Sequence, residues 1–309
     1  MKRVALVGAH TALAENISAC AEDSDLELDF LRVTTTAHVT GDLGLVGPEL
    51  LRDADALVLC FDDPVTRALW SASGEGGDRP MVAVGLDGLE GTWVEEPGAD
   101  RAARVVVVPG PAEPVAAIME TLADLEPESA RLVALESAAS FDKGGMDALS
   151  EQTRAVFGMQ DVAPRFLSGP MAFGLWSSSA PDGAEPDVKE QQSMVVLEAA
   201  MPEIRWSVSQ LWAPSFSGEM FVLDVETRRP PEGDLWARLE QGRALRRWSQ
   251  ARLSSQDAVD RDDVLLTGLQ AGSRGLRVTG AYDRLRRGGP TQVVRWLSRR
   301  FSPSGPSSE

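Results

Sequence analysis

Cysteine and histidine are scarce in this chain, and long apolar runs are missing. The 309 residues include only two cysteines, Cys20 and Cys60, and two histidines. Two cysteines cannot build a disulfide framework, and their spacing does not fit a metal site. No run of about 18 apolar residues occurs, so we expect no membrane-spanning helix. These absences predict a cytoplasmic protein without a metal centre.

Basic residues are outnumbered by acidic ones. Thirty lysines and arginines against 47 aspartates and glutamates give a net charge of −17. Binding to nucleic acid requires a basic face, so we expect no nucleic-acid partner. Basic residues do gather at 243–247, 284–287 and 295–300, which we interpret as solvated helix faces. Residues 1–8 contain no apolar segment of the signal-peptide kind, so we expect no secretion signal.

Length and composition are typical of a globular protein with two domains. The chain is 43% hydrophobic and 25% charged. Apolar runs that are expected to form strands lie at 3–7, 26–33, 54–60, 81–84 and 104–108, and a helix is expected at 114–125. Because helical or loop segments separate these runs, they predict an α/β fold. Residues 1–130 should form a Rossmann-like, doubly wound parallel sheet.

The rest of the chain predicts an α+β domain over residues 131–280. Its expected elements are helices at 145–157 and 233–248, and strands at 204–211 and 220–225 that alternate as antiparallel strands do. Residues 281–301 should end in a helix that returns to the first domain. Residues 302–309 are polar, which predicts a disordered tail.

The first strand runs into a glycine turn that only partly fits a dinucleotide site. In such a site, glycines let the backbone approach the pyrophosphate at the N-terminus of a helix. Here Gly8 is retained and Ala14 is acceptable at the third position, but Thr11 puts a β-branched side chain at the second. Thr11 is also a good N-cap residue. We therefore expect a degenerate cofactor loop.

Several segments together resemble the aspartate-semialdehyde dehydrogenase family. They occur in the family's order along the whole chain: Val4-Ala-Leu-Val-Gly-Ala9, Gly145-Met-Asp-Ala-Leu-Ser-Glu-Gln-Thr-Arg-Ala-Val-Phe157, Pro170-Met-Ala-Phe173, Leu223-Asp-Val-Glu-Thr-Arg-Arg-Pro230 and Asp283-Arg-Leu-Arg-Arg-Gly288. The resemblance implies a Rossmann domain followed by a second domain that forms a homodimer. It also implies a reaction in which a cysteine thiolate attacks the aldehyde, hydride passes to NADP, and phosphate releases the acyl group. A histidine would act as acid and base, and arginines would bind the substrate carboxylate and phosphate.

Carried over residue by residue, the family pattern lacks its catalytic groups. The family's Asn-Pro-Asn-Cys matches residues 110–113, so Glu113 stands at the nucleophile position. The family's Val-Arg-Val-Pro-Val-Phe-Val-Gly-His matches residues 211–219. Trp212 therefore replaces the substrate arginine, and Glu219 replaces the acid/base histidine.

The cofactor loops and the two cysteines do not compensate for this loss. The phosphate-side arginine of the family falls near Gly91. Its Ser-Ala-Gly-Gly cofactor loop matches Cys60-Phe61-Asp62-Asp63, where two acids would repel a pyrophosphate. Cys20 lies within the first expected helix and Cys60 at the end of a strand, as small packing residues do.

Two interpretations follow. The first is a non-catalytic paralogue that binds an unknown protein or small-molecule partner and forms a homodimer. No cofactor is expected for it, although the resemblance implies NADP. The alternative is an NAD(P)-dependent oxidoreductase with altered chemistry. In that case Glu113 and Glu219 would face each other, and would share a proton or help to hold a divalent metal.

Overall fold

The computed structural model describes most of the chain. Its described residues are 1–24, 26–35, 44–47, 51–72, 79–86, 89, 91–94, 99, 102–177, 188–250 and 252–301. The chain divides into two compact units. Unit 1 comprises Met1–Val108 and Gly289–Glu309, and unit 2 comprises Pro109–Gly288. Within the described ranges, no helix is both long and apolar enough to cross a bilayer.

Unit 1 contains a parallel sheet of the doubly wound kind. Its strands are β1 (Lys2–Val7), β2 (Leu28–Thr34), β3 (Gly44–Leu45), β4 (Ala56–Leu59), β5 (Met81–Val84), β6 (Thr92–Trp93) and β7 (Arg104–Val107). They are ordered β3-β2-β1-β4-β5-β7-β6, and the described pairs are all parallel. Residues Val4 to Val7 are completely buried, as expected for a strand covered on both faces. The predicted N-terminal Rossmann-like sheet is therefore confirmed.

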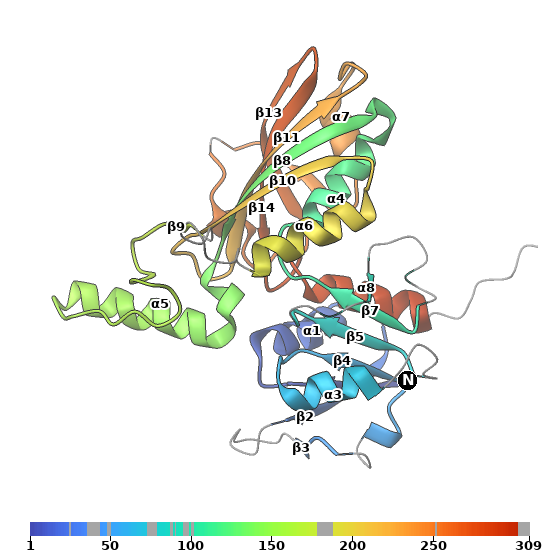
Figure 1. The fold of residues 1–309 in the computed structure, drawn as a ribbon, viewed down its shortest axis with the longest axis vertical. Coiled ribbons are helices and arrows are strands. Elements are labelled where there is room, and N and C mark those ends of the chain that lie inside the picture. Colours follow the sequence, from blue (N-terminus) through green and yellow to red (C-terminus); the bar gives the residue numbers. More distant parts are fainter. Residues whose placement is uncertain are drawn as a thin grey trace, which may run out of the picture. The chain divides into compact units, whose positions relative to one another are not determined.

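Helices cover both faces of this sheet. They are α1 (Ala12–Glu22), α3 (Pro64–Ala72) and α8 (Pro290–Phe301) (Figure 1). Helix α1 connects β1 to β2 on one side of it in the sheet, and α3 connects β4 to β5 in the opposite direction. Because parallel crossovers are right-handed, α1 and α3 lie on opposite faces. Helix α8 packs against α1, and its Trp296 indole donates a hydrogen bond to the Ala99 carbonyl (3.0 Å). The last helix thus returns to the first unit, as predicted.

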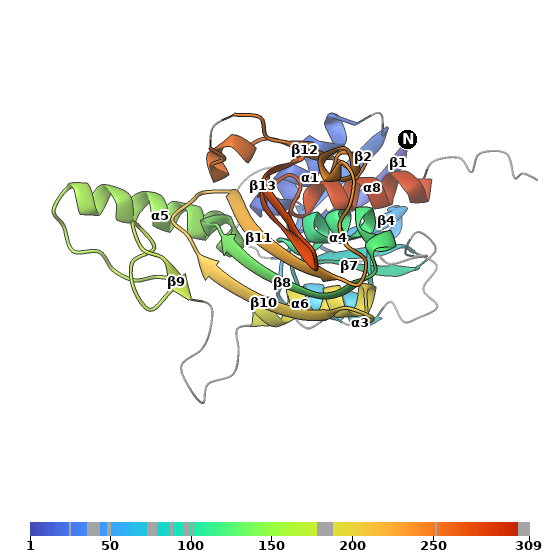
Figure 2. The same ribbon diagram turned by 90° about the horizontal axis from the view of Figure 1, so that it is seen from above.

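Unit 2 is a mixed sheet with helices on one face. Its strands are β8 (Pro127–Glu136), β9 (Trp176–Ser177), β10 (Arg205–Trp212), β11 (Gly218–Thr227), β12 (Leu245–Arg247), β13 (Val264–Gly272) and β14 (Gly275–Asp283), in the order β12-β13-β14-β11-β8-β10-β9. The longer helices on one face of this sheet are α4 (Ala112–Thr121) and α6 (Val188–Ala200), and α4 also contacts α7 (Leu235–Leu239) (Figure 2). Short 3-10 turns lie at Ala123–Leu125, Ala138–Phe141 and Ser255–Ala258.

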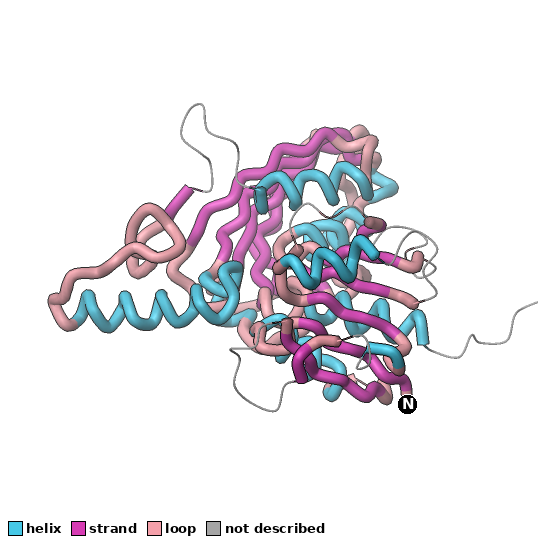
Figure 3. Tube along the Cα trace, turned by 60° about the horizontal axis from the view of Figure 1, so that its bottom comes forward, coloured by secondary structure: helices cyan, strands magenta, loops and turns pink. Residues whose placement is uncertain are grey.

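Helix α5 (Asp142–Phe157) and the loop after it project from the sheet of unit 2 as an arm (Figure 3). Gln152 fixes this loop, since its side chain accepts hydrogen bonds from the amides of Met171 (2.7 Å) and Ala172. Several large apolar side chains of the arm are exposed: Phe157, Met159, Phe173 and Leu175. Met159 and Phe173 also have positive φ angles of 52° and 62°. That conformation is unfavourable for bulky residues, so the loop exposes them at a conformational cost.

The structure corrects three expectations. The helix expected at 233–248 is limited to α7, because the chain turns at Ala244 (φ 54°) and then forms β12. The run at 204–211 was expected to be antiparallel, but β10 pairs in parallel with β8 along its whole length and is antiparallel only to the short β9. The units divide at 108/109 and 288/289 rather than at 130/131 and 280/281, since α4 packs on α6 and α7 of unit 2. The expected tail at 302–309 lies outside the described residues.

Candidate functional site

The turn from β1 into α1 is closed by local contacts. Gly8 has a φ of 83°, and a Cβ there would lie 2.5 Å from the Cβ of Phe61. Thr11 is the N-cap of α1: its hydroxyl accepts a hydrogen bond from the Ala14 amide (3.2 Å) and donates one to the Gly8 carbonyl (3.0 Å). The amide of Gly8 is bonded to the Val33 carbonyl (3.0 Å). Gly8, Thr11 and Ala14 thus form a tight helix start.

The second expected cofactor loop, residues 60–63, also has local roles. The Phe61 ring lies edge-on to His10, with centroids 4.6 Å apart. Asp62 forms a two-pronged ion pair with Arg67, both contacts at 2.6 Å. Asp63 accepts a hydrogen bond from the Thr66 amide at the start of α3 (2.7 Å). Burial acts to raise the pKa of Asp63, but hydrogen bonds to the carboxylate outweigh burial and lower it.

Glu113, at the predicted nucleophile position, is held by arginines. It lies in the first turn of α4, where a negative charge is favoured by the helix dipole, and it is fully buried. Its Oε1 is 2.6 Å from Nη2 of Arg287 and 3.8 Å from Nη2 of Arg243. Arg287 follows β14 and is itself buried. The carboxylate is therefore a partner in a buried ion pair.

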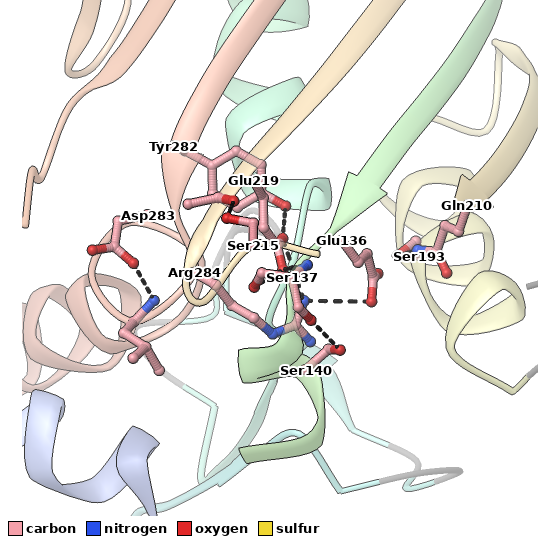
Figure 4. A network of polar contacts seen from close by, with 12 residues as sticks. Glu136, Ser137, Ser140, Ser193, Gln210, Ser215, Glu219, Tyr282, Asp283 and Arg284 are labelled. Carbon is pink, nitrogen blue, oxygen red and sulfur yellow. Dashed lines mark hydrogen bonds and ion pairs between the residues drawn. The ribbon is translucent and has the colours of Figure 1, made fainter. Parts of the chain in front are cut away.

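Glu219, at the predicted acid/base position, is the second residue of β11 and is buried (Figure 4). Its Oε1 accepts hydrogen bonds from the amide (3.0 Å) and hydroxyl (2.9 Å) of Ser137. Its Oε2 accepts one from the Tyr282 hydroxyl. Nη1 of Arg284 lies 3.1 Å from Oε1. Both carboxylate oxygens are thus engaged by groups from the ends of β8 and β14.

Arg284 is shared between two glutamates. Besides Glu219, its Nη1 lies 3.6 Å from Oε2 of Glu136, the last residue of β8. Burial acts to lower the pKa of Arg284, but the charges of Glu219 and Glu136 outweigh it and raise that pKa. Burial, and then the charge of Glu219, raise the pKa of Tyr282 well above 10, so its phenol stays protonated. Three buried carboxylates and three guanidinium groups are linked here: Glu113, Glu136 and Glu219 with Arg243, Arg284 and Arg287, and Arg243 also lies 3.5 Å from Glu120 at the surface.

Trp212, at the predicted substrate-arginine position, forms an apolar wall. It ends β10, is 4% exposed, and lies 4.6 Å from the Phe141 ring between centroids. Trp176 stands opposite to it in the pairing of β9 with β10. An indole among aromatic rings provides no charge for a carboxylate, so this position cannot bind an anion as an arginine does.

The sequence did not identify the partners of the two glutamates. The basic residues at 284–287 were interpreted as solvated, yet Arg284 and Arg287 are 5% and 2% exposed, so that interpretation is wrong for these two. Glu136 and Tyr282 were not singled out. The sequence did offer one indication of these partners. If Glu113 and Glu219 share a buried site, basic residues must lie beside them to neutralise their charge.

The described part of the chain offers no nucleophilic sulfur or metal cluster in unit 2. Cys20 and Cys60 are both buried and belong to unit 1. No group of three or more metal-ligating side chains is found among the described residues. The carboxylates of Glu113 and Glu219 are both held by buried arginines.

Comparison with known proteins gives a match in structure only. No protein-family model matches the chain, and no curated relative matches it. Aspartate semialdehyde dehydrogenase II from Vibrio cholerae, complexed with ASA, is similar over 97% of this chain and 98% of its own, with a TM-score of 0.82 and 15% identity. A probable aspartate-semialdehyde dehydrogenase from Pseudomonas aeruginosa has a TM-score of 0.83 and 18% identity. The similarity covers 96% of this chain and 97% of its own.

A third similar structure is the aspartate semialdehyde dehydrogenase from Francisella tularensis. Its TM-score is 0.79 and its identity 14%, over 96% of this chain and 99% of its own. The similarity in each case covers at least 96% of this chain and so includes both units. At such low identity, it establishes the fold that the sequence resemblance predicted.

Proposed function

We propose that this chain, which has the fold of the aspartate-semialdehyde dehydrogenases, is a non-catalytic relative of those enzymes that acts by binding. One observation carries the proposal: Glu219, at the acid/base position, is buried and accepts five hydrogen bonds. A general acid or base must reach the proton that it transfers. A carboxylate whose two oxygens are held by Ser137, Tyr282 and Arg284 is poorly suited to that task.

The nucleophile position supports the same proposal. An acyl-enzyme of thioester type needs a thiolate, which attacks and leaves well near neutral pH. Glu113 offers a carboxylate instead, and Arg287 holds it at 2.6 Å. Trp212 offers no charge for the substrate carboxylate. Three independent functions of the reaction thus lack their groups.

The alternative, an oxidoreductase that uses Glu113 and Glu219 as a pair, has less support. A proton-sharing pair needs two carboxylates that interact with each other. Here Glu113 contacts Arg287 and Arg243, and Glu219 contacts Arg284, so each charge is neutralised separately. A metal would have to displace these arginines.

Binding of NADP is the second function to be tested. A pyrophosphate would have to approach the backbone at Gly8, where Phe61 packs, and lie beside Asp62 and Asp63. Thermal-shift and calorimetric titrations with NADP and NAD would measure this, with Thr11→Gly and Thr11→Ser as matched variants. We expect no stabilisation by either nucleotide.

A homodimer through unit 2 is part of the proposal. Val133, Leu135, Leu211 and Val222 point to the face of the sheet opposite α4 and α6, and each is only partly buried. A partly exposed apolar patch on a sheet face is suited to packing against the same face of a second copy of this chain. Light scattering after gel filtration at low micromolar concentration should show a dimer. Val222→Asp should yield monomer, and Val65→Asp, at an exposed position of α3, should not.

The decisive experiment is an activity assay on wild type and Glu219→Gln. Aspartate semialdehyde, phosphate and NADP would be supplied, with the Vibrio cholerae enzyme as positive control. We expect no NADPH formation above background from either form. If wild type is active, and the Glu219→Gln variant folds but is inactive, the non-catalytic proposal is refuted and the paired-glutamate alternative is supported.

A further inference from the structure

A hollow of about 580 Å³ lies at the N-terminal edge of the sheet in unit 1. Thr92 and Arg104, the first residues of β6 and β7, line it together with Trp70 and Ser71 of α3. Because the strands are parallel, this edge is opposite to the one that carries the turn at Gly8. The hollow is therefore separate from the expected cofactor loops, and its size suits a small molecule.

Arg104 is stacked on an aromatic ring and has no ion pair with the residues that the structure describes. Its guanidinium carbon lies 4.2 Å from the centre of the Trp70 ring. Its Nε is shielded from solvent and has no hydrogen-bond partner, and no ion pair with a described residue is found. Many other described arginines of this acidic chain do have carboxylate partners, such as Arg3 with Asp29. An arginine that is stacked but not neutralised still offers its hydrogen-bond donors to an anion.

Small side chains keep this space open. A Cβ at Gly91 would lie 3.1 Å from Cζ2 of Trp70 and 3.1 Å from Cγ1 of Val106. Ala102 and Ala103 form another part of the wall, so no long side chain fills it from there. The hydroxyls of Ser71 and Thr92 add two groups that can donate hydrogen bonds.

We propose that this hollow binds the oxyanion group of a small metabolite, a carboxylate or a phosphate, through Arg104. The planar guanidinium matches both groups in a two-pronged geometry. Stacking on Trp70 fixes its plane before the ligand arrives, which reduces the ordering cost of binding. The hydroxyls of Ser71 and Thr92 complete the polar side, and Leu89 offers an apolar surface to the ligand's carbon atoms. The proposal is independent of whether unit 2 catalyses a reaction.

Calorimetric titration of the full chain at low ionic strength tests the proposal, because salt screens exposed charges. Inorganic phosphate and glutarate serve as separate probes, and the one that binds more tightly identifies the group. We expect saturable binding in wild type and about tenfold or greater weakening in Arg104→Gln. Arg104→Lys should lie between them, since it retains the charge but not the planar fork. The matched control, Arg3→Gln, removes the same charge from the same edge of the sheet and should bind as wild type does.

Three results would overturn the proposal: neither probe binds saturably, Arg104→Gln binds as well as wild type, or Arg3→Gln weakens binding equally. The last result would indicate general electrostatics. If Arg104→Gln does not fold, Gly91→Ala decides: its methyl group would crowd the Trp70 ring and Val106, both 3.1 Å away, and should weaken binding. Gly47→Ala is its control, as a Cβ there would meet no atom within 4 Å. Binding that Gly91→Ala leaves unchanged would then overturn the proposal.

Discussion

Replacing Arg284 with glutamine removes the cation that Glu136 and Glu219 share. Nη1 lies 3.1 Å from Glu219 and 3.6 Å from Glu136. At an effective dielectric constant of about 20, each contact corresponds to roughly 5 kcal/mol of Coulomb energy. Water entry and side-chain relaxation recover part of this loss. Removing one partner of a buried pair costs about 3–5 kcal/mol, and we expect that range for Arg284→Gln.

A smaller loss is expected for Glu219→Gln. Its amide oxygen can take the place of Oε1 and still accept hydrogen bonds from Ser137, and its NH2 group can donate to the Tyr282 hydroxyl, while Arg284 keeps Glu136 as a partner. We expect a destabilisation of about 1–3 kcal/mol, as for a charged hydrogen bond that becomes neutral. Because Arg284 and Glu219 interact directly, the double variant should be more stable than the sum of the single effects implies.

Urea unfolding should be followed by a probe that resolves the two units, since they need not unfold together. Hydrogen exchange of peptides from β8 and β11 reports on unit 2 directly. Arg277→Gln is the control, because Arg277 is exposed and pairs with Asp224 on the sheet surface, where an ion pair contributes little. A destabilisation by Arg284→Gln below about 1 kcal/mol, or additive effects in the double variant, would refute the buried-network argument.

Other variants test the remaining features of the two units. Gly8→Ala should destabilise unit 1 by more than about 1 kcal/mol in chemical unfolding, because its φ is 83° and its Cβ would meet Phe61, whereas Gly47→Ala should have little effect. Trp212→Arg should destabilise unit 2 by about 3–5 kcal/mol without creating activity, since the ring is buried; a stable, active variant would contradict this. Burial raises the pKa of Asp283, so its ionisation costs stability as pH rises above about 4. Unfolding at pH 4 and pH 7 should therefore show wild type losing stability relative to Asp283→Asn as the pH rises, and a constant difference would contradict that cause.

The elements with strong local signals were predictable from sequence. The strand at 81–84 was predicted with the bounds of β5, and the helix expected at the end of residues 281–301 is α8. Both have apolar residues at regular spacing over their length. The region 233–248 shows the opposite case. It contains helix-forming residues, but the hydrogen bond from the Trp248 amide to the Leu266 carbonyl (2.7 Å) places its end beside β13.

Strand direction is another property that the sequence could not give. Alternation at 204–211 identifies a strand and its buried face, but it is the same for parallel and antiparallel neighbours. The neighbour of β10 on one side is β8, which lies some 70 residues earlier and pairs with it in parallel. Only the tertiary fold specifies such a long-range pairing.

The sequence by itself determined the α/β fold class, the Rossmann-like start and the return of the last helix. The assignment of Glu113, Trp212 and Glu219 to the family's catalytic positions stays a prediction. The tertiary structure alone decided which groups those residues contact. Arg284 and Arg287 are adjacent to other basic residues in the chain, so their charge pattern resembles that of a solvated surface. They are buried because β14 ends where β8, β11 and α4 present carboxylates, and a buried charge requires a partner from wherever the fold brings one close.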